Sequence, residues 1–164
     1  MDHLWSPWRY QYVSSEPPVA NGCVFCRKAE AGKEEENLVL FRGTHCYVLL
    51  NLSPYTNGHL MIAPYEHVDS LAAASPAAAA EMMDLARVAE TALRQVYRPG
   101  GINLGMNLGA CAGAGVAGHI HLHVLPRWPG DANFLSVVGE TRVLIEELPV
   151  TWQRLREAFA SLIS

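Results

Sequence analysis

The chain has 164 residues and a formal net charge of −4 at neutral pH, with 50% hydrophobic and 17% charged residues. This length fits one globular domain over residues 1–164 whose core needs no disulfides. The chain is slightly acidic and has no Lys/Arg cluster, so no nucleic-acid partner is expected. It has no apolar run of membrane length and no signal peptide, which predicts a cytoplasmic protein with no membrane partner.

An aromatic segment opens the chain. The stretch W-S-P-W-R-Y-Q-Y over residues 5–12 has no clear periodicity, and so many aromatic side chains are expected to pack on the core or on a second subunit. Residues 14–22 are rich in Ser, Glu, Pro, Asn and Gly and predict a loop. We therefore expect an aromatic extension over residues 1–22 that favours a homodimer.

Three short strands are predicted after a charged turn over residues 30–37. They span residues 38–41, 46–51 and 59–63. Gly43-Thr44 predicts a hairpin turn between the first two, and the turn-rich residues 51–58 join the second to the third. Because no helix separates these strands, antiparallel pairing and an α+β class are expected.

The clearest helix is predicted over residues 76–97. Ser75 has the character of an N-cap, Pro76 suits the first helical position, and Pro99-Gly100 ends the pattern. One stripe carries the apolar residues Met82, Leu85, Ala89, Ala92, Leu93 and Val96. We expect this stripe to pack on the sheet.

The remaining elements follow in short succession. A fourth strand over residues 101–108, a flexible Gly/Ala loop over 109–118 and a fifth strand over 119–126 are predicted. Two short helical stretches are expected after residue 134, and the last carries Trp152, Leu155, Phe159 and Leu162 at helical spacing.

Three histidines alternate with aliphatic residues in the predicted fifth strand. His119, His121 and His123 would share one face, about 7 Å apart along the row, while Ile120, Leu122 and Val124 enter the core. Two such imidazoles could share a metal, but three on one straight strand could hardly converge on it. The row therefore implies divided roles, and imidazoles suit an anionic reacting group such as a phosphate.

Four cysteines are present, and disulfides are not expected in a reducing compartment. Cys46 is interpreted as a small core residue, and Cys111 is given no role. Cys23-x-x-Cys26 can chelate zinc but needs two further ligands, and a metal-free pair of thiols remains open. The candidate ligands are His3, His45, His59, His67 and the histidine row.

The motif H-I-H-L-H-V-L over residues 119–125 fits the pattern His-φ-His-φ-His-φ-φ, and the chain resembles the histidine-triad (HIT) family of nucleotide hydrolases and transferases. The flanking segments, above all P-R-W-x-x-D-A-N-F, resemble its diadenosine tetraphosphate phosphorylase-like branch. The resemblance implies a HIT-like fold, an antiparallel sheet with a long packed helix and C-terminal helices, in a homodimer. It also implies phosphorolysis of diadenosine tetraphosphate to ATP and ADP through a nucleotidyl-histidine intermediate.

The resemblance assigns roles to single residues. His121 becomes the nucleophile and His123 a charged or hydrogen-bond-donating imidazole on the phosphate. Asn107 and the small loop residues Gly113, Ala114 and Gly115 would contact phosphates, the loop through its main chain. Asn51 and His59 would line the nucleoside side, with Asn51 toward the ribose. From the residues alone, Asn51 is equally well an ordinary turn residue, and a Gly/Ala loop is more commonly a flexible connector.

The resemblance also completes the zinc site with His67, from a P-x-x-H segment, and His119. Such a closed Cys₂His₂ site would be structural, and no organic cofactor is expected. Three alternatives stay open. They are a hydrolase of dinucleoside polyphosphates or nucleoside phosphoramidates, a metal-dependent hydrolase or oxygenase using His119 and His121, and a nucleotide-binding zinc scaffold without turnover.

Overall fold

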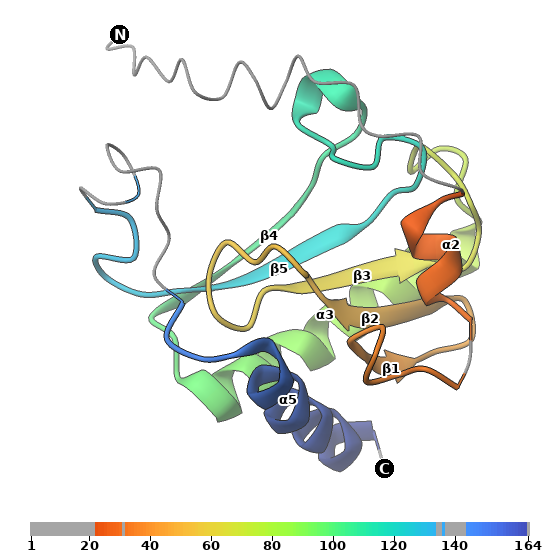
Figure 1. The fold of residues 1–164 in the computed structure, drawn as a ribbon. Helices are drawn as coiled ribbons and strands as arrows, with labels where there is room; N and C mark the ends of the chain where they lie inside the picture. The colour runs from red at the N-terminus through yellow and green to blue at the C-terminus, as the bar shows by residue number, and fades with distance from the viewer. Residues whose placement is uncertain (1–21, 31, 134–135, 137–143, 164) are drawn as a thin grey trace, which may run out of the picture.

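The computed structural model describes residues 22–30, 32–133, 136 and 144–163. Its centre is a five-stranded antiparallel sheet with the strand order β1-β2-β3-β5-β4 (Figure 1). The strands are β1 (Val39–Arg42), β2 (Cys46–Leu50), β3 (Leu60–Pro64), β4 (Gly101–Met106) and β5 (Leu122–Arg127). The predicted antiparallel α+β class is confirmed. The aromatic segment at residues 5–12 and most of the first C-terminal helical stretch lie outside the described residues.

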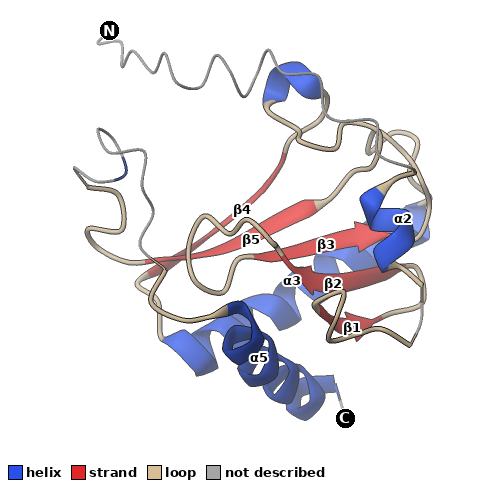
Figure 2. Ribbon diagram, in the orientation of Figure 1, coloured by secondary structure: helices blue, strands red, loops and turns tan. Residues whose placement is uncertain are grey.

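Two long helices cover one face of the sheet (Figure 2). Helix α3 (Pro76–Tyr97) has the predicted bounds, because the Ser75 hydroxyl accepts the N–H of Ala78 at 3.2 Å and Arg98 ends the helix in a left-handed conformation. Helix α5 (Leu148–Ile163) packs beside it. The main core lies between these helices and the sheet.

The opposite face carries a smaller apolar cluster under the short helix α2 (Val24–Lys28). Phe25 of α2 packs there against Val39, Leu49 and Met61. The sequence did not predict α2, because five residues are too few to display a helical period. This second face is the one on which the histidine row lies.

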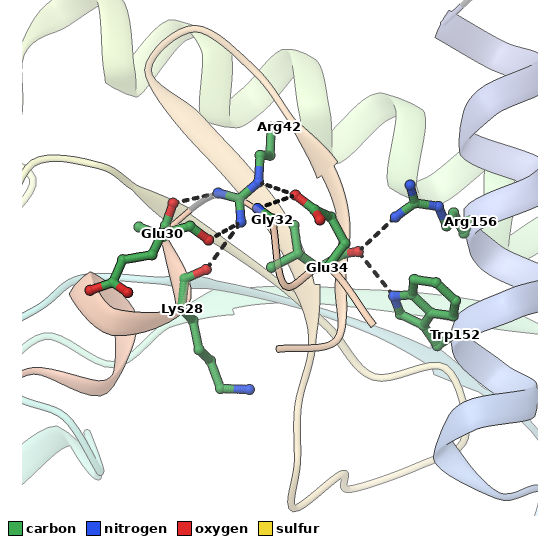
Figure 3. Close-up of polar contacts among 9 residues, drawn as sticks. Lys28, Glu30, Gly32, Glu34, Arg42, Trp152 and Arg156 are labelled. Carbon is green, nitrogen blue, oxygen red and sulfur yellow. Dashed lines mark hydrogen bonds and ion pairs between the residues drawn. The ribbon is translucent and has the colours of Figure 1, made fainter. Parts of the chain in front are cut away.

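Arg42 anchors α2 to the sheet (Figure 3). Its guanidinium donates to the carbonyls of Lys28, Ala29 and Glu30 at 3.4, 2.5 and 2.7 Å, and to the Glu34 carboxylate at 3.0 Å. The carbonyls at the end of a helix have no partner within the helix, so Arg42 satisfies them and fixes where α2 ends.

Glu81 of α3 fixes the β1–β2 hairpin in a similar way. Its carboxylate accepts the backbone N–H groups of Thr44, His45 and Cys46 at 2.8, 2.5 and 2.6 Å. Burial opposes ionisation, but these three donors outweigh it and hold the pKa of Glu81 below its ordinary value. Cys46 is fully buried beside this contact, as expected of a small core residue.

None of the helices in the described part of the chain combines the length and the apolar character that a membrane crossing requires.

Candidate active site and metal cluster

The histidine row lies on the α2 face, and the alternation predicted from the sequence is confirmed. Ile120, Leu122 and Val124 enter the main core, while the rings of His119 and His121 contact the Phe25 ring at centroid distances of 5.2 and 4.6 Å.

Two details of the predicted row are wrong. β5 begins at Leu122 and not at His119, because the N–H of Ile120 bonds to the carbonyl of Val68, in the loop after β3. The rings of His121 and His123 are 4.8 Å apart between centroids, closer than the backbone spacing of about 7 Å, because the side chains lean toward each other.

The hydrogen bond of His121 defines its tautomer. Its Nδ1 lies 3.0 Å from the carbonyl oxygen of His119, and a carbonyl can only accept, so Nδ1 carries the proton and Nε2 carries the lone pair. Burial lowers the pKa of His121, although the bond to the His119 carbonyl partly opposes this effect. His121 is therefore a neutral imidazole with a nucleophilic nitrogen.

A chain of hydrogen bonds defines the tautomer of His123 in the same way. The N–H of Tyr55 donates to Nδ1 of His59 at 3.1 Å, so the proton of His59 is on Nε2. This Nε2 lies 2.9 Å from Nδ1 of His123 and donates to it. The Nε2–H of His123 is then a donor. Burial, together with the neighbouring His121, lowers the pKa of His123 to about 4, so His123 is a neutral donor rather than a cation.

A cavity of about 900 Å³ lies over this face, within the size range of small-molecule sites. Of the residues that the sequence placed in the site, those lining the cavity are Asn51, Asn107, Gly113, Gly115, His121 and His123. Ala114 and His59 are not among the lining residues, and His59 lies behind His123.

The loop after β4 is ordered by its own contacts. It contains the 3-10 turn Ala110–Ala112, after which Gly113 has a left-handed backbone with φ of 89°, a conformation that favours glycine. Asn107 donates to the Gly113 carbonyl at 3.4 Å. Asn51 is both a cavity residue and a turn residue. It lines the cavity, and its Oδ1 accepts the N–H of Ser53 at 3.0 Å in a turn.

The four predicted metal ligands lie together, with their ligand atoms all within 4.8 Å of one another. Nδ1 of His119 is 3.4 and 3.6 Å from the sulfurs of Cys23 and Cys26, and Nδ1 of His67 is 3.3 Å from the Cys26 sulfur. Zinc–ligand distances of about 2.3 Å to sulfur and about 2.0–2.1 Å to nitrogen put tetrahedral S and N ligands about 3.6 Å apart. The cluster therefore fits a tetrahedral ion.

The outer contact of His119 fits a metal ligand as well. Its Nε2 lies 2.9 Å from the Pro64 carbonyl and must donate to it, which leaves the lone pair of Nδ1 toward the thiols. His121 is not part of this cluster, and no second group of three or more metal-ligating side chains occurs in the described ranges. This arrangement argues against a metal pair formed by His119 and His121.

The cavity-lining residues that sequence reasoning missed include Phe25, Lys28 and Tyr55. The helical spacing of Phe25 and Lys28 could have revealed that they share a face, but only once α2 was recognised. Tyr55 lies in a turn-rich segment, and its stacking against His123, at a centroid distance of 6.0 Å, leaves no mark in the sequence.

Comparison with known proteins defines the class to which this site belongs. The HIT domain family matches residues 32–130, more than half of the chain, and the chain therefore belongs to the HIT family. The "AP-4-A phosphorylase" of Mycobacterium tuberculosis is 37% identical over 166 residues, covering 98% of this chain and 85% of that protein. The "Adenylylsulfatase HINT3" of Arabidopsis thaliana is 31% identical, covering 72% of this chain and 58% of that protein.

Among solved structures, a Zn-bound histidine triad family protein from Mycobacterium smegmatis is similar to this chain. It superposes with a TM-score of 0.68 at 26% identity, covering 87% of this chain and 96% of that one. The HIT-like fold expected from the resemblance is confirmed.

Proposed function

We propose that the protein is a nucleotidyltransferase that cleaves dinucleoside polyphosphates through a nucleotidyl-histidine intermediate on His121. Diadenosine tetraphosphate is the proposed substrate and inorganic phosphate the acceptor, giving ATP and ADP. The observation that carries the proposal is the bond from His121 to the His119 carbonyl, which leaves Nε2 of a cavity-lining imidazole as a nucleophile. Family membership and the 37% identical relative support an enzyme acting on nucleotides.

The proposed reaction has two steps. Nε2 of His121 attacks the α-phosphorus, the bond from phosphorus to the bridging oxygen breaks, and ATP leaves with the electron pair. An oxygen of inorganic phosphate then attacks the adenylyl group, the N–P bond breaks, and ADP leaves with neutral His121 restored. The Nε2–H of His123 and the N–H groups of the loop after β4 stabilise the charge that develops on the phosphoryl oxygens.

Water as the acceptor would yield AMP in place of ADP, and the same residues would serve this alternative hydrolase. Product analysis of diadenosine tetraphosphate turnover, with and without phosphate, separates the two reactions. ADP formation that depends on phosphate is expected. AMP as the product in both conditions would replace phosphorolysis by hydrolysis, and no turnover would favour the scaffold without catalysis.

The His121→Ala variant tests the nucleophile itself. We expect turnover to fall by orders of magnitude because the covalent route is lost, while nucleotide binding persists. The exposed His45, in the β1–β2 hairpin, gives the matched control His45→Ala with unchanged turnover. A nucleotidyl adduct trapped on His119 or His123, or near-normal turnover of the His121 variant, would overturn the assignment.

We further propose that the Cys23, Cys26, His67 and His119 cluster holds a structural zinc ion. The tetrahedral spacing of the ligand atoms supports this, as does the Zn-bound relative. Zinc bound there would tie α2 to the loop before β5. Elemental analysis of protein purified without chelator should give one zinc per chain, and absence of zinc would refute the proposal.

Three further expectations remain proposals. They are a single domain over residues 1–164, a homodimer and a cytoplasmic location. The domain rests on the chain length, the homodimer on the family resemblance and the aromatic N-terminal segment, and the location on the sequence features described above. Light scattering coupled to size-exclusion chromatography tests the dimer, and a monomer at micromolar concentration would contradict it.

A further inference from the structure

Leu49, Met61 and His123 line the cavity and belong to one row of residues that crosses the sheet. Strand pairing places Val39, Leu49, Met61, His123 and Gly105 side by side, in that order. Neighbouring strands lie about 4.8 Å apart, so the row runs roughly 14 Å from His123 on β5 to Val39 on β1. The loop after β4, over residues 109–118, begins at the other end of the row. A base that continues from a phosphate at the histidines along the apolar residues Met61 and Leu49 of this row would lie over β2 and β1.

Lys28 lies at the β1 end of this row. Its Nζ donates to the carbonyl of Asn37, just before β1, at 3.0 Å, and Lys28 is one of the residues that line the cavity. Figure 3 shows the Lys28 carbonyl turned toward Arg42 and the side chain pointing away from it. Lys28 comes three residues after Phe25, so both lie on the same face of α2. Among the cavity-lining residues of the described ranges, it alone is a lysine or arginine.

We propose that Lys28 sets the base preference of the cavity, so that among dinucleoside polyphosphates the protein cleaves diadenosine tetraphosphate but favours a 6-oxopurine such as guanine over adenine. The inference rests on the proposed function and names the substrate class of that same site. An ammonium has three N–H donors and no acceptor, and one donor serves Asn37. Guanine offers the adjacent acceptors O6 and N7, whereas adenine places an amino donor beside N7.

The surroundings strengthen this discrimination. Val24, Leu49 and Met61 give this end of the cavity an apolar lining, in which a hydrogen bond is stronger than in water and an opposed pair of donors costs more. The ammonium is itself partly desolvated, which lowers the pKa of Lys28. A base carbonyl would restore part of the solvation that Lys28 has lost.

The test compares two substrates in the same variant. Lys28→Met keeps the aliphatic stem and removes the donors. The ratio of kcat/KM for diguanosine tetraphosphate to that for diadenosine tetraphosphate should fall roughly 5- to 100-fold, the discrimination expected of a base contact. Because both substrates meet the same protein sample, partial unfolding cancels from the ratio. Lys33→Met, at an exposed lysine outside this cavity, should leave the ratio unchanged, and Lys28→Arg should keep the preference for guanine.

Calorimetric binding of GMP and AMP gives a readout that needs no turnover. The GMP-to-AMP affinity ratio should fall in Lys28→Met by a similar factor. An unchanged ratio, or an equal loss for both nucleotides, would overturn the inference, since Lys28 would then support only the helix or the phosphates. If neither dinucleotide is cleaved while the binding ratio still shifts, the proposed function fails and the base preference stands.

Discussion

Two substitutions at His59 separate the role of its Nε2–H from that of its bulk. In the structure, Nδ1 of His59 accepts the Tyr55 N–H and Nε2 donates to His123. A glutamine amide reaches about as far as Nε2 and can still donate to His123, whereas an asparagine amide reaches only the position of Nδ1. In His59→Asn, His123 should therefore no longer be held in the tautomer with its proton on Nε2. In His59→Gln, His123 should keep this tautomer.

The expected magnitude follows from the hydrogen bond that is lost. A net contribution of about 1–1.5 kcal/mol corresponds to roughly a tenfold fall in the population of the His123 tautomer with its donor on Nε2. If the His123 ring also becomes less well ordered, kcat falls further. The upper limit is the roughly 10²–10³-fold fall expected when a hydrogen-bond donor to the transition state is removed altogether. We expect kcat for diadenosine tetraphosphate to fall about 10- to 50-fold in His59→Asn and less than about threefold in His59→Gln, with KM little changed.

Steady-state kinetics, corrected for the fraction of active enzyme, give the two kcat values, and ¹⁵N chemical shifts of His123 report its tautomer directly. A mixture of tautomers is expected in His59→Asn and a single one in the wild type. Equal kcat losses in the two variants, or a single tautomer in both, would refute the reasoning, because His59 would then act only by filling space.

Two further predictions concern neighbouring contacts. His123→Ala removes one donor to the phosphate and should lower kcat by roughly 10²–10³, less than His121→Ala, in the same turnover assay. Glu81→Gln replaces a carboxylate that accepts three backbone N–H groups and should lower the free energy of unfolding by about 1–3 kcal/mol at pH 7. Because the pKa of Glu81 is lowered in the folded state, this stabilisation is present above about pH 4.5 and is lost as the pH falls further. Urea unfolding at pH 7 and pH 4 should therefore show the gap between the wild type and Glu81→Gln closing at the lower pH.

The sequence predicted those parts of the fold that depend on the chemistry of neighbouring residues in the chain. Ser75 and Pro76 set the start of α3 by capping and by backbone restriction, and both features are read from single residues. The alternation from His119 onward predicted which side chains face the core. It could not show where pairing with β3 begins, since an extended segment alternates whether or not a neighbouring strand is bonded to it.

The part of the site that escaped prediction is made of contacts between distant segments. His59 and His123 are 64 residues apart and share a hydrogen bond, which no local pattern encodes, so His59 was expected at the cavity wall rather than behind His123. Lys28 was overlooked for a similar reason, because its position in the cavity depends on how Arg42 holds the end of α2.

His119 links the metal cluster to the proposed nucleophile, and this link predicts what metal loss does. Its Nδ1 faces the thiols, its Nε2 bonds to the Pro64 carbonyl, and its own carbonyl accepts Nδ1 of His121. The last two contacts do not need the ion, so His121 should keep its tautomer without it. Cys26→Ser should therefore reduce kcat less than about tenfold.

Cys26→Ser should lower the stability of the fold more strongly than it lowers kcat. Free zinc at about 100 times its dissociation constant contributes about 2.7 kcal/mol to the free energy of unfolding, which corresponds to roughly 5–11 °C in the unfolding midpoint of a chain of this size. Cys111→Ser, at an exposed cysteine outside the cluster, is the matched control with unchanged zinc content and midpoint. If the zinc-free variant stayed folded at its normal midpoint yet lost all turnover, the ion would belong to the chemistry and not to the scaffold.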